Sequence, residues 1–339
     1  MIGIALVGAG HWGPNLLRNF HNKQSSSVLW AIDQDPDRLK LVSSKYPEIS
    51  LGSDLSEAIE DSRVDAVVIA TPTSTHYPIA KAALSAGRHV LVEKPISSTS
   101  TQAEELCEIA LSRGVVLMVG HVFIFNPGVR KVREYLTNDL LGRIHYISMV
   151  RTNLGPIRVD VNAAWDLASH DISIVNHWLG TGPLTASAIG GSWINPGVDD
   201  VVFASLRFPD EILVNLHVSW LNPRKARDIT VVGERKMLTF DDMNLTEPLR
   251  IYDKQVTDEL IDPGLVDTFG LFRASIREGD VTIPKVPIGE PLMLECSHFL
   301  ECIDSATPPL TGGPEGLAVV KVLEAIQRSI ENDGLEEKV

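Results

Sequence analysis

The chain has 339 residues, 44% of them hydrophobic and 22% charged, and its 30 Lys and Arg against 44 Asp and Glu residues give a net charge of −14. The length favours two domains, and the composition is typical of a globular protein with a full hydrophobic core. The acidic balance argues against nucleic-acid binding, which needs a concentrated basic surface.

No apolar run approaches the ~20 residues that a membrane span needs, and the first predicted strand begins at Ile2, too early for a signal peptide. We therefore expect a cytoplasmic protein with no membrane contact. Three cysteines lie in apolar helical patterns, which favours reduced core thiols over disulfides or a metal cluster. They are Cys107, Cys296 and Cys302.

The first predicted strand, Ile2–Val7, leads into a glycine-rich turn, and a helical pattern opens at Pro14. The G-x-G-x-x-G spacing gives a tight turn, close approach of the backbone to a pyrophosphate and close packing of helix on strand. The helix that follows aims its amino-terminal N–H groups at the phosphates. The turn therefore predicts dinucleotide binding, with candidate contacts at Gly8, Gly10, His11, Trp12 and Gly13.

A second predicted strand, Val28–Ile32, ends at Asp33, which lies 20 residues beyond Gly13. A carboxylate at this place hydrogen-bonds a ribose 2′-hydroxyl and repels a 2′-phosphate, so Asp33 favours NAD over NADP. The alternative is a glycine turn in some other βα unit, with Asp33 beginning a polar loop.

The next elements continue the alternation of strand and helix. Asp35 can cap a helix that starts at Pro36, a short strand lies near 49–51, a short helix is plausible over 54–61, and residues 64–70 read as a strand buried on both faces.

A polar loop over 71–76 follows that strand. Loops at this end of a parallel sheet line the ligand crevice, so the candidate cofactor contacts are Thr71, Thr73 and His76. The alternative is a capped loop, with Ser74 or Thr75 starting the next helix.

A further strand over 89–92 stops at Glu93-Lys94-Pro95, and a helix over 101–113 precedes a strand over 115–119. Six strands that alternate with helices predict a doubly wound parallel sheet. We assign residues 1–121 to this cofactor-binding domain.

The pattern changes after residue 121. A helix with Val129 and Val132 on one face precedes a strand over 144–152, and a second helix lies near 168–179. Strands then follow one another, and 212–220 shows the period-two alternation of a half-buried antiparallel sheet. Two helices close the chain, near 292–305 and 315–330. We assign residues 122–339 to an α+β domain with a predominantly antiparallel sheet.

Glu93 and Lys94 are expected beside the reactive ring of the cofactor, at the end of a central strand. A lysine there can bind a substrate hydroxyl and stabilise the alkoxide as the proton leaves. Pro95 restricts Lys94 to extended geometry and permits a cis peptide bond. The alternative is a surface ion pair that closes a strand.

In the second domain, Asp166 and His170 are four residues apart at a helix start. If this turn is helical they share one face, and an imidazole oriented by a carboxylate can take a proton near neutral pH. An ordinary capped helix would show the same spacing. His177, on the same face, suggests a zinc site as an alternative. However, Asp166, His170 and His177 lack the compact spacing of zinc ligands, and hydride transfer to NAD needs no metal.

These motifs resemble the Gfo/Idh/MocA oxidoreductase family over nearly the whole chain. The most specific stretch is Ala86–Pro95, which ends in the Glu-Lys-Pro hallmark of the family, and the other matching stretches are Gly8–Gly13, Ala70–His76 and Asp166–Ile172. The resemblance implies a Rossmann domain, a second domain whose open sheet supports dimers or tetramers, and Lys94, His170 and Asp166 as catalytic lysine, proton-transferring histidine and supporting aspartate. Ser173 and the approach Ala163–Trp165 depart from the family pattern near the substrate.

Within the family, Arg151–Arg158 and Asn222–Arg227 are similar to bacterial UDP-N-acetylglucosamine 3-dehydrogenases, which implies oxidation of a C3 hydroxyl of a nucleotide sugar for surface-polysaccharide or amino-sugar biosynthesis. Basic side chains in an acidic protein could bind a diphosphate. The candidate substrate contacts are Lys94, Arg151, Arg158, Asp166, His170 and Arg227. The alternatives are scattered surface arginines, a free sugar or inositol dehydrogenase, and a non-catalytic NAD-binding regulator.

Overall fold

The structure, a computed structural model, describes residues 1–256, 276–277 and 279–339. It divides into two compact units: residues 1–126 with 289–324, and residues 127–288 with 325–339. The boundary drawn from the sequence at residue 121 differs from this division, because residues 289–324 belong to the first unit. The physical reason is the packing of α9 (Pro291–Ser305) on α1 (Gly13–His21), where Phe20 and Phe299 meet edge to face.

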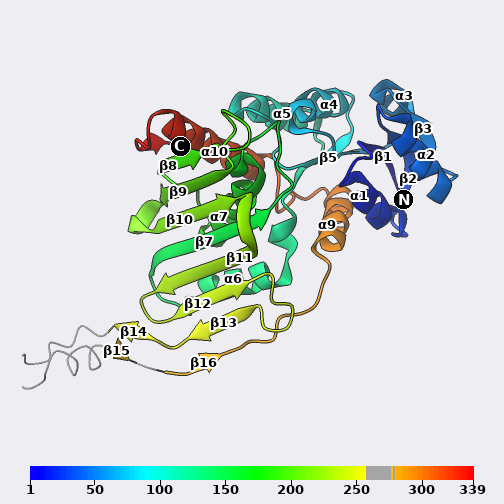
Figure 1. Ribbon diagram of the computed structural model, residues 1–339. Helices are drawn as coiled ribbons and strands as arrows, with labels where there is room; N and C mark the ends of the chain where they lie inside the picture. Colours follow the sequence, from blue (N-terminus) through cyan, green and yellow to red (C-terminus); the bar gives the residue numbers. More distant parts are fainter. Residues whose placement is uncertain (257–275, 278) are drawn as a thin grey trace, which may run out of the picture. The chain divides into compact units, whose positions relative to one another are not determined.

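The first unit contains a six-stranded, all-parallel sheet in the order β3-β2-β1-β4-β5-β6 (Figure 1). This confirms the predicted doubly wound sheet. Helices α4 and α5 cover one face, and α1 and α9 cover the other. The central strands are apolar on both faces and fully buried, as parallel strands between two helical layers must be. The strands are β1 (Ile2–Val7), β2 (Ser26–Ile32), β3 (Ser50–Gly52), β4 (Ala66–Ile69), β5 (His89–Glu93) and β6 (Leu117–Gly120).

Several helices of this unit begin at a residue whose side chain caps them. Asp35 and Asp54 each accept a main-chain N–H from the first turn of the helix that follows, and Gly114 ends α5 in the left-handed region. The remaining helical elements are α2 (Pro36–Lys45), α3 (Leu55–Glu60), α4 (Thr73–Ser85), α5 (Ser100–Arg113) and the short η1 (Val122–Phe125). Helix α10 (Gly313–Glu331) begins in this unit.

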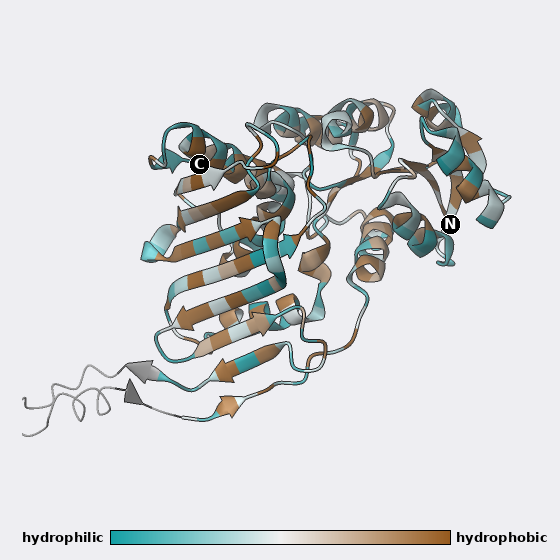
Figure 2. Ribbon diagram, viewed as in Figure 1, coloured by the Kyte–Doolittle hydropathy of each residue, from teal (hydrophilic) through white to brown (hydrophobic). Residues whose placement is uncertain are grey.

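The second unit is built on a nine-stranded sheet in the order β16-β13-β12-β11-β7-β10-β9-β8-β17. All neighbouring strands are antiparallel except β10 and β7, which are parallel. Burial alternates along β9 and β10, and Figure 2 shows the matching alternation of hydrophobic and hydrophilic residues. The predicted α+β class with a mainly antiparallel sheet is confirmed.

This sheet is larger than the sequence indicated, because further strands pair on both sides of the predicted ones. Strands β7 (Ile144–Leu154) and β10 (Leu213–Ser219) match those expected over 144–152 and 212–220, and β9 (Val201–Arg207), β11 (Leu221–Gly233) and β12 (Met237–Asp241) are among the strands expected to follow one another. The additional strands are β8 (Thr185–Gly191), β13 (Leu249–Tyr252), β16 (Val281–Thr282) and β17 (Glu337–Lys338), and β14 (Gln255–Val256) pairs separately with β15 (Ile276–Arg277). The helical elements are α6 (Pro127–Thr137), η2 (Ala164–Ala168), α7 (Ser169–Leu179) and η3 (Pro209–Glu211).

Within the described residues, no helix combines the length and the apolar character needed to cross a membrane. The three cysteines are free thiols.

Candidate active site

The glycine-rich turn joins β1 to α1 at the carboxyl edge of the parallel sheet. Gly8 has φ +95°, and a Cβ at Gly13 would lie 1.9 Å from the Gly8 carbonyl oxygen. A Cβ at Gly10 would meet nothing closer than the Arg38 guanidinium, at 3.3 Å. Gly8 and Gly13 therefore fix the turn and its packing, whereas Gly10 leaves one side open. Helix α1 begins there without a side-chain cap, so its first N–H groups suit phosphate oxygens and the turn fits a dinucleotide.

Asp33 lies directly beside this turn. Its Oδ2 accepts the Ala9 main-chain N–H at 2.6 Å and its Oδ1 accepts that of Asp35 at 2.9 Å. The Asp33 side chain is only 7% exposed, and Arg38 Nη1 lies 3.6 Å from its Oδ2. A carboxylate has about four acceptor sites, so Asp33 can hold the turn and still accept a ribose hydroxyl.

The predicted loop over residues 71–76 is mostly helix, because α4 begins at Thr73. Pro72 precedes the helix, and the Thr75 hydroxyl donates back to Thr71 Oγ1 at 2.8 Å. His76 is buried, with Nδ1 2.7 Å from the Pro95 carbonyl oxygen and Nε2 2.8 Å from that of Thr71. His76 thus links the end of β4 to the segment after Lys94, while Thr71 remains at the strand end where a ligand would lie.

Glu93 ends β5, and the Lys94–Pro95 peptide is cis. A Cβ at Gly120, the last residue of the neighbouring β6, would lie 3.1 Å from the Glu93 carboxyl oxygens. Burial raises the pKa of Glu93 to about 7, although the charge of Lys94, its main-chain N–H and the Trp12 indole N–H oppose this shift. The carboxyl end of β5 therefore presents an ammonium group beside a carboxyl group that titrates near neutral pH.

Two residues of this region were not singled out from the sequence. His121 follows β6, and burial together with the Lys94 charge lowers its pKa to about 3, so its ring stays neutral. Glu295 comes from α9 and is completely buried, and burial followed by the charge of Glu93 raises its pKa. A sequence signal for Glu295 exists only in hindsight, as an acid among the buried positions Leu292, Cys296 and Phe299 of α9.

In the second unit, Asp166 lies in η2, which is a π-helix directly before α7. Asp166 and His170 therefore lie on either side of the junction between a π-helix, which pairs residues i and i+5, and an α-helix. Single π-helical turns are frequent at functional sites. Asp166 Oδ1 accepts from Arg158 Nη1 at 3.2 Å, and Oδ2 accepts from the Trp220 indole N–H at 3.1 Å. Arg158 and Trp220 thus fix both carboxylate oxygens.

The two basic segments meet in the sheet, because Arg151 of β7 and Arg227 of β11 are register partners. Arg151 is buried and donates from Nε and Nη2 to Asp171 Oδ1, at 2.9 and 2.7 Å. Arg227 donates to Asp242 at 2.8 Å, but its side chain remains 35% exposed. Arg158 also binds Asp160, at 2.9 and 2.6 Å. The structure therefore brings Arg151 and Arg227 together, and each of the three predicted arginines has a carboxylate partner.

Metal ligands do not gather in the described part of the chain: no three His, Cys, Asp or Glu side chains come together as a metal site would require. His177 lies beside Arg130 and Arg133, and burial followed by their charges lowers its pKa to about 4.

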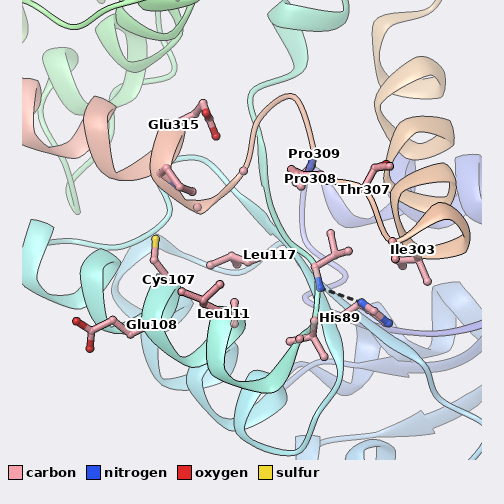
Figure 3. Close-up of a pocket in the computed structure, with 18 residues that line it drawn as sticks. His89, Cys107, Glu108, Leu111, Leu117, Ile303, Thr307, Pro308, Pro309 and Glu315 are labelled. Atoms are coloured by element: carbon pink, nitrogen blue, oxygen red, sulfur yellow. Dashed lines mark hydrogen bonds between the residues drawn. The ribbon is translucent and has the colours of Figure 1, made fainter.

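A cavity of about 630 Å³ lies at the amino ends of strands β5 and β6, which begin at His89 and Leu117 (Figure 3). Its walls are mainly apolar and come from α5 and from the segment over residues 303–315, which bonds to β6 through Thr311 and Val119. Ligands of open parallel sheets bind at the carboxyl ends of the strands, so this cavity is separate from the cofactor site.

Two family models match the chain: an oxidoreductase family with an NAD-binding Rossmann fold over residues 2–121, and a GFO/IDH/MocA C-terminal domain over residues 129–239. The chain belongs to the Gfo/Idh/MocA family. Its cofactor is NAD, which the first unit binds, and as a Gfo/Idh/MocA protein it is an oxidoreductase.

Several known proteins are similar to this chain over nearly its whole length. The UDP-N-acetylglucosamine 3-dehydrogenase of Acidithiobacillus ferrooxidans is 25% identical over 96% of both chains, and its crystal structure has a TM-score of 0.82 over 98% of this chain and 99% of that one. The myo-inositol 2-dehydrogenase of Thermotoga maritima is 24% identical over 97% of this chain and 96% of its own. The Bordetella pertussis WlbA dehydrogenase, solved with NADH and UDP-GlcNAcA, shares 20% identity and the fold, with a TM-score of 0.80 over 100% and 98% of the two chains.

Proposed function

We propose that this Gfo/Idh/MocA protein oxidises a secondary hydroxyl of a nucleotide sugar to a ketone, with the C3 hydroxyl of UDP-N-acetylglucosamine as the leading candidate. The observation that carries the proposal is the full-length similarity to a UDP-N-acetylglucosamine 3-dehydrogenase, together with a Lys94 that directly follows β5 in the NAD-binding unit. A role in surface-polysaccharide or amino-sugar biosynthesis follows from that substrate class.

In this proposal, Lys94 donates a hydrogen bond to the substrate oxygen and stabilises negative charge on it. His170 takes the hydroxyl proton, and Asp166 orients the imidazole because Arg158 and Trp220 hold its carboxylate. The C–H electron pair leaves with its hydrogen as hydride, and the C–O bond becomes a carbonyl. NAD, when bound, supplies the hydride acceptor. Its binding residues are the glycine turn from Gly8 to Gly13, Asp33, Thr71, Thr73 and Glu93, with His76 supporting the Thr71 backbone.

The diphosphate of the substrate would be bound by Arg158 and Arg227, which are partly exposed. Arg151 is buried against Asp171, so it would stabilise β7 rather than contact the diphosphate directly. Each arginine already has a carboxylate partner, so the ligand phosphates would share or displace these partners.

A second candidate is a free sugar or inositol dehydrogenase with the same catalytic residues. It is supported by the similarity to a myo-inositol 2-dehydrogenase. It is also supported by the carboxylates that already pair with Arg158 and Arg227, because these arginines need no phosphate to balance their charge. The test is incubation with NAD and a panel of UDP-sugars, dTDP-sugars, cyclitols and aldoses, while NADH absorbance is followed and any ketone is trapped. Competition by UDP alone supports a nucleotide sugar, whereas its absence favours the second candidate. No NADH with any member would support a non-catalytic NAD-binding regulator.

We also propose that the protein forms a homodimer or homotetramer through the outer face of the nine-stranded sheet. Apolar side chains on four adjacent strands share this face by register, and they are substantially exposed: Tyr146 at 45%, Ile189 at 60%, Phe203 at 46% and Leu213 at 46%. Phe203 stacks on His217 at 4.4 Å between ring centroids. Exposed apolar side chains gathered on one face of a sheet are typical of an interface.

A further inference from the structure

The cavity at the amino ends of β5 and β6 is bounded on one side by the segment between α9 and α10. Ala306 ends α9 in the left-handed region at φ +52°, and Pro308 and Pro309 follow, so the helix does not continue. The segment then joins β6. The Thr311 hydroxyl donates to the Val119 carbonyl oxygen at 2.8 Å, and the Thr311 carbonyl oxygen accepts the Val119 N–H at 2.7 Å. This wall is therefore tied to the parallel sheet, which pre-forms the cavity.

Two close contacts fix the other walls. A Cβ at Gly313 would lie 2.7 Å from Cys107 Sγ and 3.0 Å from Leu117 Cδ2, so a glycine is needed where the segment meets α5 and β6. His89 Nδ1 accepts the Val116 N–H at 3.0 Å. Burial lowers the pKa of His89 below its ordinary value of 6.5, so its ring is neutral at pH 7 and brings no positive charge to the cavity.

The cavity has the size and the lining of a small-molecule site. Its volume is about 630 Å³, whereas such sites measure about 300–1,000 Å³. Apolar side chains form most of the wall, among them Leu111, Val116, Leu117, Ile303, Pro308 and Pro309. Leu111 is 85% exposed, so apolar surface reaches solvent at the rim of the cavity. An apolar ligand would remove this surface from water.

Both charged side chains among the 18 residues that line the cavity are acidic. They are Glu108 of α5 and Glu315 in the first turn of α10 (Figure 3). A further carboxylate, Glu104, lies on α5 but is paired with Lys321 at 2.9 Å. Burial raises the pKa of the Cys107 thiol to about 11, and the charges of these three glutamates raise it further. The lining therefore attracts a cation and repels an anion.

We propose that this cavity is a second ligand site, which binds a small apolar molecule that carries a primary ammonium group. The apolar body lies between α5 and residues 303–309, and the ammonium group is held by Glu108 and Glu315. The site is separate from the NAD site, because β5 runs from His89 at the cavity to Glu93 at the carboxyl end, a rise of about 13 Å. This inference goes beyond the proposed function and does not depend on it.

Two fluorescent probes with the same apolar body test the ligand class on the full chain. One carries a dansyl group on diaminopentane, and the other carries it on aminohexanoic acid, so the two differ in the sign of their charge. At pH 7 and low salt, the amine probe is expected to bind once per chain with a rise in dansyl emission. The acid probe is expected to bind at least about tenfold more weakly, and salt to reduce this difference. Equal affinities, or tighter binding of the acid probe, overturn the proposal.

Two variants locate the bound probe. Ala110→Phe places a ring in the cavity that Ala110 lines, and is expected to weaken binding of the amine probe at least about tenfold. Leu111→Gln changes an exposed position and is expected to weaken binding about threefold, because apolar contact is lost. Full affinity in both variants excludes this cavity. If Ala110→Phe does not fold, Leu111→Gln decides.

A double variant tests the charge. Glu108→Gln with Glu315→Gln is expected to reduce the preference for the amine probe to about threefold or less. The control, Asp37→Asn with Glu48→Gln, also removes two exposed carboxylates, but beside α2, which packs on β2, three strands away from β5. It is expected to leave the preference unchanged. Equal effects of the two double variants would show that net charge, and not the cavity, selects the amine.

Competition separates this site from the cofactor site. Saturating NAD is expected to leave the amine probe bound, and displacement of the probe by NAD contradicts a separate site. None of these measurements needs turnover, so the absence of NADH formation with every sugar would refute the proposed function and leave this test unaffected.

Discussion

The indole N–H of Trp220 donates to Asp166 Oδ2 at 3.1 Å, so a completely buried tryptophan between β10 and β11 holds the carboxylate in the π-helical turn before α7. Arg158 donates to the other oxygen at 3.2 Å. The Asp166 carboxylate is thus oriented by the body of the sheet.

Trp220→Phe removes this donor while it keeps most of the buried ring. We expect kcat to fall about tenfold, because one neutral hydrogen bond to a charged group is worth about 1.5 kcal/mol, and NAD affinity to stay unchanged. The control is Trp178→Phe, which removes an indole donor to the Val129 carbonyl oxygen on the same unit. Equal losses of kcat in the two variants would show that Trp220 acts through folding alone.

Lys94→Ala and His170→Ala test the proposed chemistry directly. Each is expected to lower kcat by about 10²–10⁴, the usual contribution of a positioned proton-transfer group, while NAD still binds. Steady-state kinetics and NAD titration measure the two effects separately. Wild-type turnover in both variants would refute the assignment of these residues.

Asp33→Asn tests cofactor choice. The substitution removes the negative charge that opposes a 2′-phosphate and leaves Arg38 next to the ribose site. The ratio of kcat/KM for NAD over NADP is expected to fall by about 10-fold or more. Asp37→Asn is the matched control, since Asp37 lies on the exposed surface of α2 and binds Lys40. An unchanged ratio in Asp33→Asn would mean that Asp33 only supports the turn.

Glu295→Gln tests the cost of the buried acid through stability. The folded-state pKa of Glu295 is raised, so the folded protein prefers the protonated side chain. The contribution of this preference to the free energy of unfolding is complete below the unfolded pKa of about 4.3 and is lost as pH rises above it. The variant is therefore expected to be more stable than wild type at neutral pH, with a gain in Tm that shrinks as pH falls toward about 4.3. Thermal unfolding of the cofactor-free protein measures this. A gain that does not change with pH would argue for a packing effect.

Phe203→Glu tests the proposed interface. A charge in the centre of the exposed apolar face should dissociate the oligomer, because a buried, unpaired charge opposes association. Sedimentation velocity measures the mass, and Leu111→Glu, at an exposed position on α5 in the other unit, serves as control. A wild-type monomer, or an oligomer unaffected by Phe203→Glu, would exclude this face.

The first unit could be predicted from the sequence because its signals are local. Most strands of the parallel sheet are short apolar runs, α2, α3 and α5 begin at residues whose side chains cap them, and Gly8 and Gly13 specify their turn through steric limits that involve few other residues. The same locality placed Glu93 and Lys94 at the end of β5.

Tertiary structure decided what depends on distant partners. Pairing along β7 and β11 brings Arg151 beside Arg227, and packing against α1 places α9, with the buried Glu295, in the first unit. The π-helical turn at Asp166 is likewise accompanied by side-chain bonds to Arg158 and Trp220, up to 54 residues away. Periodicity reports which face of an element is buried, but not which distant element covers it.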